Sequence, residues 1–136
     1  YYFRDFFYAD TGLLAAMHLI AALDQSAKPM SELAEIYQPY HASGELNRQV
    51  ADVAQTLAKV REAYTADAAA GAIGLDDLDG LTIDHWDASP RWWANVRGSN
   101  TEPLLRLNVE AADFDVMVKV RDGLLALLDD LAATDE

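Results

Sequence analysis

One short stretch of the sequence collects side chains that bind anions. The guanidinium of Arg97 offers a planar fork of N–H donors that matches two oxygens of a phosphate or a carboxylate. Ser99 and Thr101 add hydroxyl groups, and Asn100 adds a side-chain amide. Gly98 permits backbone conformations that other residues avoid and lets a ligand approach the main chain. A tight loop can also turn consecutive N–H groups toward one point, so these residues predict a phosphate-binding loop.

The residues on either side of this stretch predict that it joins two strands. Apolar and polar side chains alternate over 91–97 and again over 103–110, as in a half-buried strand. Glu102 is the only acid nearby, and Pro103 fixes where the second strand begins. The plain alternative is a hairpin loop without function, because Gly, Ser, Asn and Thr are ordinary turn formers.

The elements that must position this loop follow from the period of the apolar residues. A helical period predicts helices over 13–23, 31–37 and about 50–64, and one that begins after Asp113 with Phe114 facing inward. Asp10 or Thr11 would cap the first of these helices, and Ser31 the second. A further strand is predicted over 81–85, and residues 41–47 read as a linker that runs into a short strand.

This order of elements predicts the α+β class, with a small antiparallel sheet covered on one face by two helices. Residues 66–74 read as a flexible segment and 76–80 as an acidic turn. We expect residues 1–38 to be a helical appendage that belongs to another domain, and 39–136 to be the domain that carries the loop.

Composition limits the partners of the chain. Its 136 residues carry a formal net charge of −13, which should repel nucleic acid and anionic membranes. It contains no cysteine, which excludes disulfides and thiolate metal sites and fits a cytoplasmic protein. No apolar run reaches the roughly 20 residues that a membrane span needs.

The first eight residues are unusually aromatic. They read YYFRDFFY, whereas natural N-termini are mostly polar and frayed. The segment therefore reads as an interior strand or packed loop whose neighbour is missing from this chain. We expect the apolar face of residues 1–38 to associate with a second copy.

Beyond this reading of its residues, the stretch from Trp92 to Ala111 resembles the phosphate-binding loop and following strand in the last domain of the α-D-phosphohexomutases. Its Ser-Asn-Thr-Glu-Pro form is similar to the phosphomannomutase/phosphoglucomutase branch, whereas the phosphoglucosamine mutase branch usually has Ser-Gly-Thr-Glu-Pro. Residues 2–12 resemble the segment after the sugar-binding loop of the third domain, and 40–47 resemble the entry to the fourth.

The resemblance implies a four-domain enzyme that moves a phosphoryl group between the 1- and 6-positions of a phosphorylated hexose, mannose or glucose, through a bisphosphate intermediate. A phosphoserine of the first domain would exchange that group, Mg²⁺ would bind to the second domain, and the third would read the sugar hydroxyls. Residues 39–136 would be its TBP-like fourth domain. There Arg97, Gly98, Ser99, Asn100 and Thr101 would clamp the phosphate that is not reacting.

The sequence lacks the other parts of that machinery. It contains no phosphoserine loop and no aspartate metal motif, so we expect no catalytic residue, no metal site and no mutase activity in this chain alone. Arg91 is a remote candidate for a second phosphate contact, and Arg106 is expected to be a surface ion-pair partner. The alternatives are a stand-alone module that binds phosphosugars without catalysis, a phosphoglucosamine mutase fragment, or a plain interaction domain.

Overall fold

The computed structural model describes residues 2–133, and the chain divides after Pro39 into two compact units. Each unit is described by itself. Tyr1 of the predicted appendage and residues 134–136 of the predicted loop-bearing domain lie outside the described residues.

The first unit combines a small hairpin with two helices. Its elements are β1 (Tyr2–Phe3), β2 (Ala9–Asp10), α1 (Gly12–Ser26) and α2 (Met30–Ile36). The hydroxyl of Thr11 caps α1 by accepting the N–H of Leu14 at 3.4 Å, as one of the two predicted caps. The predicted cap of α2 by Ser31 is wrong. Helix α2 begins one residue earlier, after Pro29, whose ring fixes φ near the helical value, and no side chain caps it.

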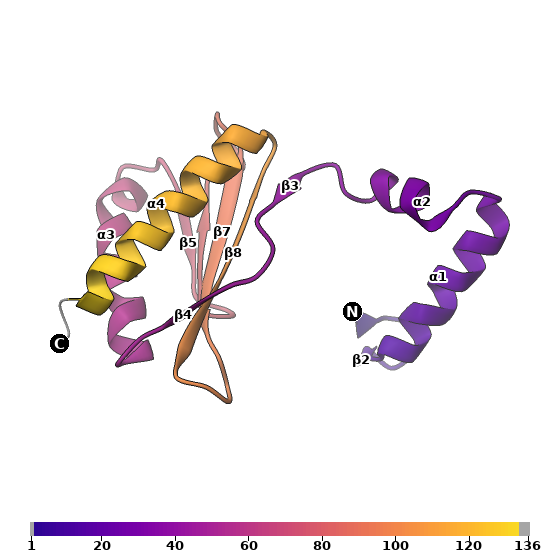
Figure 1. The fold of residues 1–136 in the computed structure, drawn as a ribbon, viewed down its shortest axis with the longest axis horizontal. Helices are drawn as coiled ribbons and strands as arrows, with labels where there is room; N and C mark the ends of the chain where they lie inside the picture. The colour runs from indigo at the N-terminus through magenta and orange to yellow at the C-terminus, as the bar shows by residue number, and fades with distance from the viewer. Residues whose placement is uncertain (1, 134–136) are drawn as a thin grey trace. The chain divides into compact units, whose positions relative to one another are not determined.

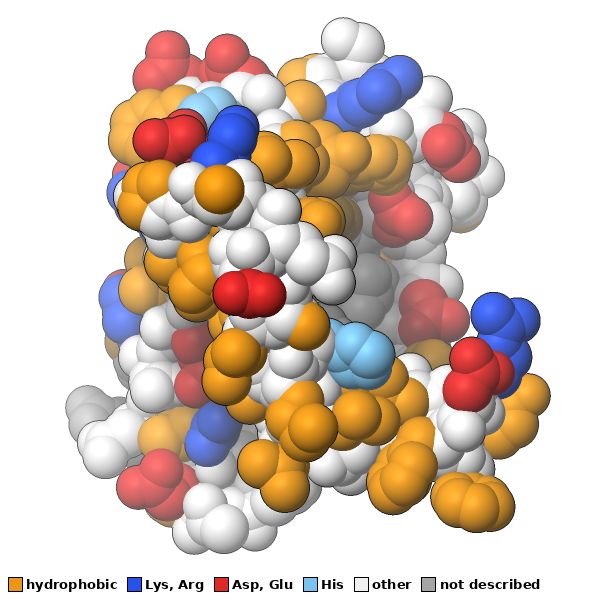
Figure 2. Space-filling model, turned by 90° about the vertical axis from the view of Figure 1, so that its right-hand side faces the viewer, with side chains coloured by type: hydrophobic (Ala, Val, Ile, Leu, Met, Phe, Trp, Pro, Cys, Tyr) orange, Lys and Arg blue, Asp and Glu red, His pale blue; other side chains and the backbone are white. Residues whose placement is uncertain are grey.

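Much of the apolar surface of this unit is exposed. Within the described residues, α1 buries none of its side chains. Leu13, Met17 and Ile20, which share one face of α1, are 75%, 59% and 66% exposed. The hydrophobic side chains of this unit are visible in Figure 2. None of the helices in residues 2–133 has the length and apolar content that a membrane span requires.

The second unit is a six-stranded antiparallel sheet with two helices on one face, which confirms the predicted α+β class (Figure 1). The strands follow the order β3-β8-β7-β6-β5, and β4 also pairs with β8. Its elements are β3 (His41–Ala42), β4 (Leu46–Gln49), α3 (Val53–Ala69), β5 (Gly74–Asp76), β6 (Leu81–Asp84), β7 (Trp92–Gly98), β8 (Leu104–Ala111) and α4 (Phe114–Ala133).

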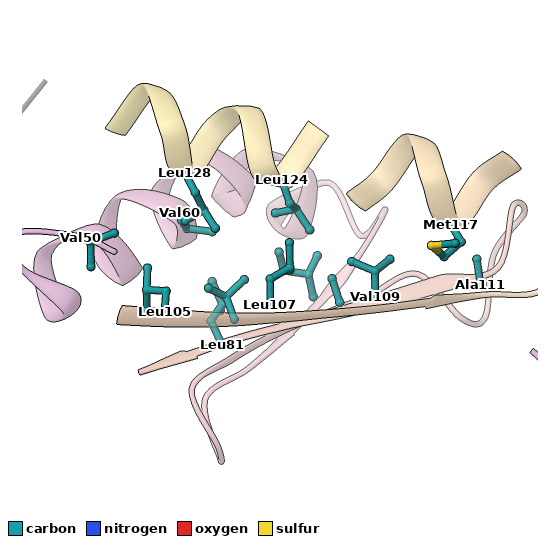
Figure 3. Close-up of a cluster of buried hydrophobic side chains, with 13 residues drawn as sticks. Val50, Val60, Leu81, Leu105, Leu107, Val109, Ala111, Met117, Leu124 and Leu128 are labelled. Atoms are coloured by element: carbon teal, nitrogen blue, oxygen red, sulfur yellow. The ribbon is translucent and has the colours of Figure 1, made fainter. Parts of the chain in front are cut away.

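The core lies between the sheet and the two helices. Leu105, Leu107 and Val109 of β8 point toward α4, where Leu124 and Leu128 meet them (Figure 3). Each of these five side chains is at most 1% exposed. Because side chains alternate along a strand, the polar residues between them face the other side of the sheet, away from the helices.

Three details differ from the predictions. Helix α3 continues to Ala69, through part of the segment predicted to be flexible, because its run of alanines favours helix. Residues 74–76 form β5, which pairs with β6. Phe114 is 56% exposed rather than inward, and its ring contacts His41 edge to face. Asp113 does cap α4 by accepting the N–H groups of Asp115 and Val116, as predicted.

Candidate functional site

The predicted anion-binding loop joins β7 to β8 and projects beyond the other strands of the sheet (Figure 1). The N–H of Ser99 donates to the carbonyl of Leu104 at 2.9 Å, which closes the hairpin. The N–H of Leu104 donates in turn to the carbonyl of Glu102 at 2.8 Å. The loop between Ser99 and Leu104 is therefore held at its base and leaves its tip to solvent.

Arg97 and Arg106 lie directly opposite each other on β7 and β8, on the face away from the helices. Their side chains are 34% and 30% exposed. Like charges placed opposite each other destabilise a strand pair. Glu45 offsets this repulsion, because its carboxylate lies 3.3 Å from Nη2 of Arg97 and 3.2 Å from Nη1 of Arg106.

The hydroxyl groups of the loop lie beside the second of these arginines. Nη2 of Arg106 donates to Oγ of Ser99 at 3.4 Å. Oγ of Ser99 lies 3.5 Å from Oγ1 of Thr101 and accepts the N–H of Thr101 at 3.4 Å. These contacts are at the long end of hydrogen-bond geometry, so the hydroxyls can turn toward a ligand at little cost. Within residues 2–133, Arg97 makes no hydrogen bond to either hydroxyl group. Its guanidinium is joined to that of Arg106 through Glu45, and Arg106 is the arginine that reaches the hydroxyls.

The sequence reasoning missed two members of this cluster. Arg106 is an ion-pair partner, as predicted, but it also contacts Ser99 and faces Arg97. The register brings these residues together, because a loop of residues 100–103 closed by Ser99 and Leu104 sets Arg97 against Arg106. The strand limits predicted from the sequence, at 97 and 103, did not give this register. The prediction that Glu102 is the only nearby acid is wrong, since Glu45 comes from a segment far away in sequence.

Gly98 does not adopt the left-handed backbone conformation that only glycine reaches easily. Its φ angle lies outside the left-handed region, unlike that of Gly44, Gly71 or Gly80. A Cβ at Gly98 would instead come within 2.8 Å of Cγ1 of Val53, at the start of α3. The residue therefore allows α3 to pack closely under the end of β7.

Asn100 does not join the cluster. Its side chain is exposed and makes no hydrogen bond within residues 2–133. The predicted nest of consecutive N–H groups is also incomplete, because the N–H of Ser99 is used by the hairpin. In the described part of the chain, the N–H of Asn100 carries no hydrogen bond and is available to a ligand.

Arg91 and the acidic side chains of residues 76–80 are not part of this cluster. Arg91 precedes β7 at the end opposite to Arg97, roughly 20 Å away at about 3.3 Å per residue. In the acidic turn, Asp77 is paired with Arg61, and Asp76 accepts the N–H of Leu78 at 3.0 Å. Residues 2–133 contain no group of three His, Cys, Asp or Glu side chains that could hold a metal ion.

Comparison with known proteins identifies the domain that carries this cluster. Residues 45–127 match the family model of the phosphoglucomutase/phosphomannomutase C-terminal domain. The chain is 38% identical over 132 residues to a phosphomannomutase of Escherichia coli and 36% identical over 132 residues to a phosphomannomutase of Methanocaldococcus jannaschii. A Xanthomonas campestris protein with the name "Phosphohexose mutases" is 35% identical to the chain over 122 residues.

These alignments cover most of the chain but a small part of each relative. The alignment with the Escherichia coli protein covers 94% of this chain and 27% of the relative. The corresponding values are 95% and 27% for the Methanocaldococcus jannaschii protein, and 89% and 25% for the Xanthomonas campestris protein. The chain thus spans about a quarter of the length of these proteins. It belongs to the phosphoglucomutase/phosphomannomutase family and contains the C-terminal domain of that family.

Proposed function

We propose that the cluster around Arg97 and Arg106 holds the phosphate group of a phosphorylated hexose that is not being transferred. The observation that carries this proposal is the position of Arg97 opposite Arg106, whose guanidinium also reaches Oγ of Ser99 beside Oγ1 of Thr101, on a partly exposed patch. The match of residues 45–127 to the C-terminal domain of a phosphohexose mutase family supports the same reading.

The charges of the cluster favour a doubly charged anion. Arg97 and Arg106 contribute two positive charges and Glu45 one negative charge, in a chain whose formal net charge is −13. Two neighbouring guanidinium groups can each donate two parallel hydrogen bonds to phosphate oxygens. Nε of Arg106 is buried and has no hydrogen-bond partner among the described residues, so the exposed Nη groups are the donors that an anion can reach.

By holding the phosphate that does not react, the cluster would position the substrate for transfer at its other end. A substrate anchored at both ends keeps its reacting oxygen in line with the phosphoryl group, and such positioning can lower a transfer barrier by several kcal/mol. The clamp would not touch the reacting atoms. This chain would accordingly bind phosphosugars weakly and turn over none.

The remaining features of the parent enzyme are inferred from the family. We propose that it interconverts hexose 1-phosphate and 6-phosphate in the cytoplasm, where phosphorylated hexoses are made and consumed. Residues 1–38 would be the end of its third domain, and 39–136 its fourth. The chain offers no fitting metal site in residues 2–133, so the Mg²⁺ that the resemblance implies would be bound by residues outside this chain.

Titration of the 136-residue chain with glucose 1-phosphate tests the proposal. We expect weak, saturable binding in calorimetry, and a loss of about tenfold or more in affinity for Arg97→Ala, because hydrogen bonds to charged groups are the strong ones. Arg91→Ala is the matched control, since it removes the same charge at the far end of β7. Equal affinity of the Arg97→Ala variant and the wild-type chain would refute the assigned role.

A further inference from the structure

Glu45 is directed at the two arginines by a β-bulge in the edge of the sheet. Ala42 pairs with Glu110 and Leu46 pairs with Leu107, so three residues on one side, 43–45, oppose two on β8, 108 and 109. Such a bulge re-aims the side chains next to it. Gly44 sits at its centre with φ +68°, in the left-handed region that favours glycine.

The backbone of the bulge is fixed by Ser43. The N–H of Ser43 donates to the carbonyl of Val109 at 2.9 Å, and Oγ of Ser43 accepts the N–H of Val109 at 2.9 Å. The same hydroxyl donates to the carbonyl of Gly44 at 2.7 Å. The backbone that leads into Glu45 is therefore held by hydrogen bonds that do not involve the arginines.

The carboxylate of Glu45 meets the same donors that an incoming phosphate would need. Its Oε2 accepts from Nη2 of Arg97 at 3.3 Å, and its two oxygens lie 3.2 and 3.5 Å from Nη1 of Arg106. The side chain is 38% exposed and makes no other hydrogen bond or ion pair within residues 2–133. It can thus turn toward solvent without breaking a further polar interaction in the described chain.

We propose that Glu45 is an internal competitor that lowers the affinity of the phosphate site. This inference rests on the function proposed above. A tethered carboxylate acts at an effective concentration of about millimolar or more, and an anion that binds to both arginines must first displace it. This cost is the same for every anion. A phosphate dianion carries a second charge and a third oxygen, so it offsets the cost better than a free carboxylate does.

Glu45→Gln separates this role from a purely structural one. If Glu45 merely held the two arginines in position, the variant would bind phosphate more weakly. If it competes, the variant binds inorganic phosphate roughly three- to tenfold more tightly, the range expected from losing one or two half-exposed ion pairs. Acetate, which would have to displace the same carboxylate, should also bind more tightly to the variant. Glu45→Asp, with a shorter side chain, should lie between the wild-type chain and Glu45→Gln.

The experiment is a pair of titrations, with inorganic phosphate and with acetate, of the full ¹⁵N-labelled chain followed by NMR, whose spectra also show that each variant is folded. Glu110→Gln is the matched control, since it makes the same charge change. Glu110 lies on the same face of β8 as Arg106, about 13 Å from it along the strand. It should leave the phosphate affinity nearly unchanged.

Each outcome bears on the inference in a distinct way. Tighter binding of phosphate and of acetate in Glu45→Gln, and not in Glu110→Gln, would support it. Unchanged or weaker phosphate binding in Glu45→Gln, with binding still lost in Arg97→Ala, would overturn the role of Glu45 and leave the proposed function intact. The absence of phosphate binding in the wild-type chain and in every variant would overturn both.

Discussion

Gly80 lies directly against Arg97. A Cβ added to Gly80 would come within 2.5 Å of Cβ of Arg97 and within 2.5 Å of the carbonyl oxygen of Val96. The turn that contains Gly80 is tied to β7 by Asn95, whose side-chain amide donates to the carbonyl of Asp79 at 2.8 Å. The acidic turn predicted over residues 76–80 thus supports the backbone from which the Arg97 side chain extends.

Gly80→Ala should therefore weaken both stability and phosphate binding. Its φ of +73° lies in the left-handed region, where a side chain costs about 1–3 kcal/mol, and the new Cβ would also push on β7. Unfolding by urea and titration with glucose 1-phosphate would measure the two effects. Gly71→Ala is the control, because Gly71 has φ +74° but nothing within 4 Å of its Cβ position. It should lose stability and keep its affinity; an equal affinity loss in both would contradict this account.

Arg106→Ala should lower the affinity for glucose 1-phosphate by about tenfold, because Arg106 shares the site with Arg97 rather than serving as an unrelated surface ion pair. A double-mutant cycle with Arg97→Ala should show losses that are not additive, since the two side chains would bind one ligand. Arg48→Ala is a suitable control. Arg48 is also a strand arginine in an exposed ion pair, with Asp129 at 2.8 Å, and its removal should not alter affinity.

The alternation of β7 and β8 was readable in the sequence, and it correctly separated the buried Leu105 and Leu107 from the outward Arg106. The position of Glu45 was not readable. It depends on the pairing of a distant segment with β8 and on a bulge that shifts its register by one residue. The contact between Gly80 and Arg97 was hidden for the same reason, because it depends on how neighbouring strands approach each other rather than on any local pattern.

The exposed apolar face of α1 should cause the chain to self-associate. Leu13, Met17 and Ile20 lie on that face and are each more than half exposed. Light scattering should give an apparent mass that rises above 15.0 kDa with concentration. The double variant Met17→Gln/Ile20→Gln should remain closer to the monomer mass. Leu78→Gln, which alters a 93% exposed side chain of the acidic turn, should not change association. A monomer mass that does not change with concentration in the wild-type chain would rule out self-association through α1.

Tyr64 should make the stability of the second unit sensitive to alkaline pH. Burial raises the pKa of the Tyr64 hydroxyl above 10.0, and the nearby negative charge of Asp67 raises the pKa further. The folded state therefore holds this proton more tightly than the unfolded state, so stability is fully present below pH 10 and is lost as the pH rises through the folded pKa.

Urea unfolding at neutral pH and above pH 10 would measure this loss. The wild-type chain should lose more stability across that interval than Tyr64→Phe, which has no proton to release. Tyr37→Phe, at a residue that is 74% exposed, should lose as much as the wild-type chain. Identical losses in wild type and Tyr64→Phe would show that this hydroxyl does not contribute.

The most direct test of the phosphate clamp is to map where glucose 1-phosphate binds on the ¹⁵N-labelled chain by NMR. The account predicts saturable shifts of the Arg97 and Arg106 side-chain N–H signals and of the amides of Ser99, Asn100 and Thr101, and their disappearance in Arg97→Ala. Shifts confined to other parts of the second unit, or the same shifts in Arg97→Ala, would contradict it.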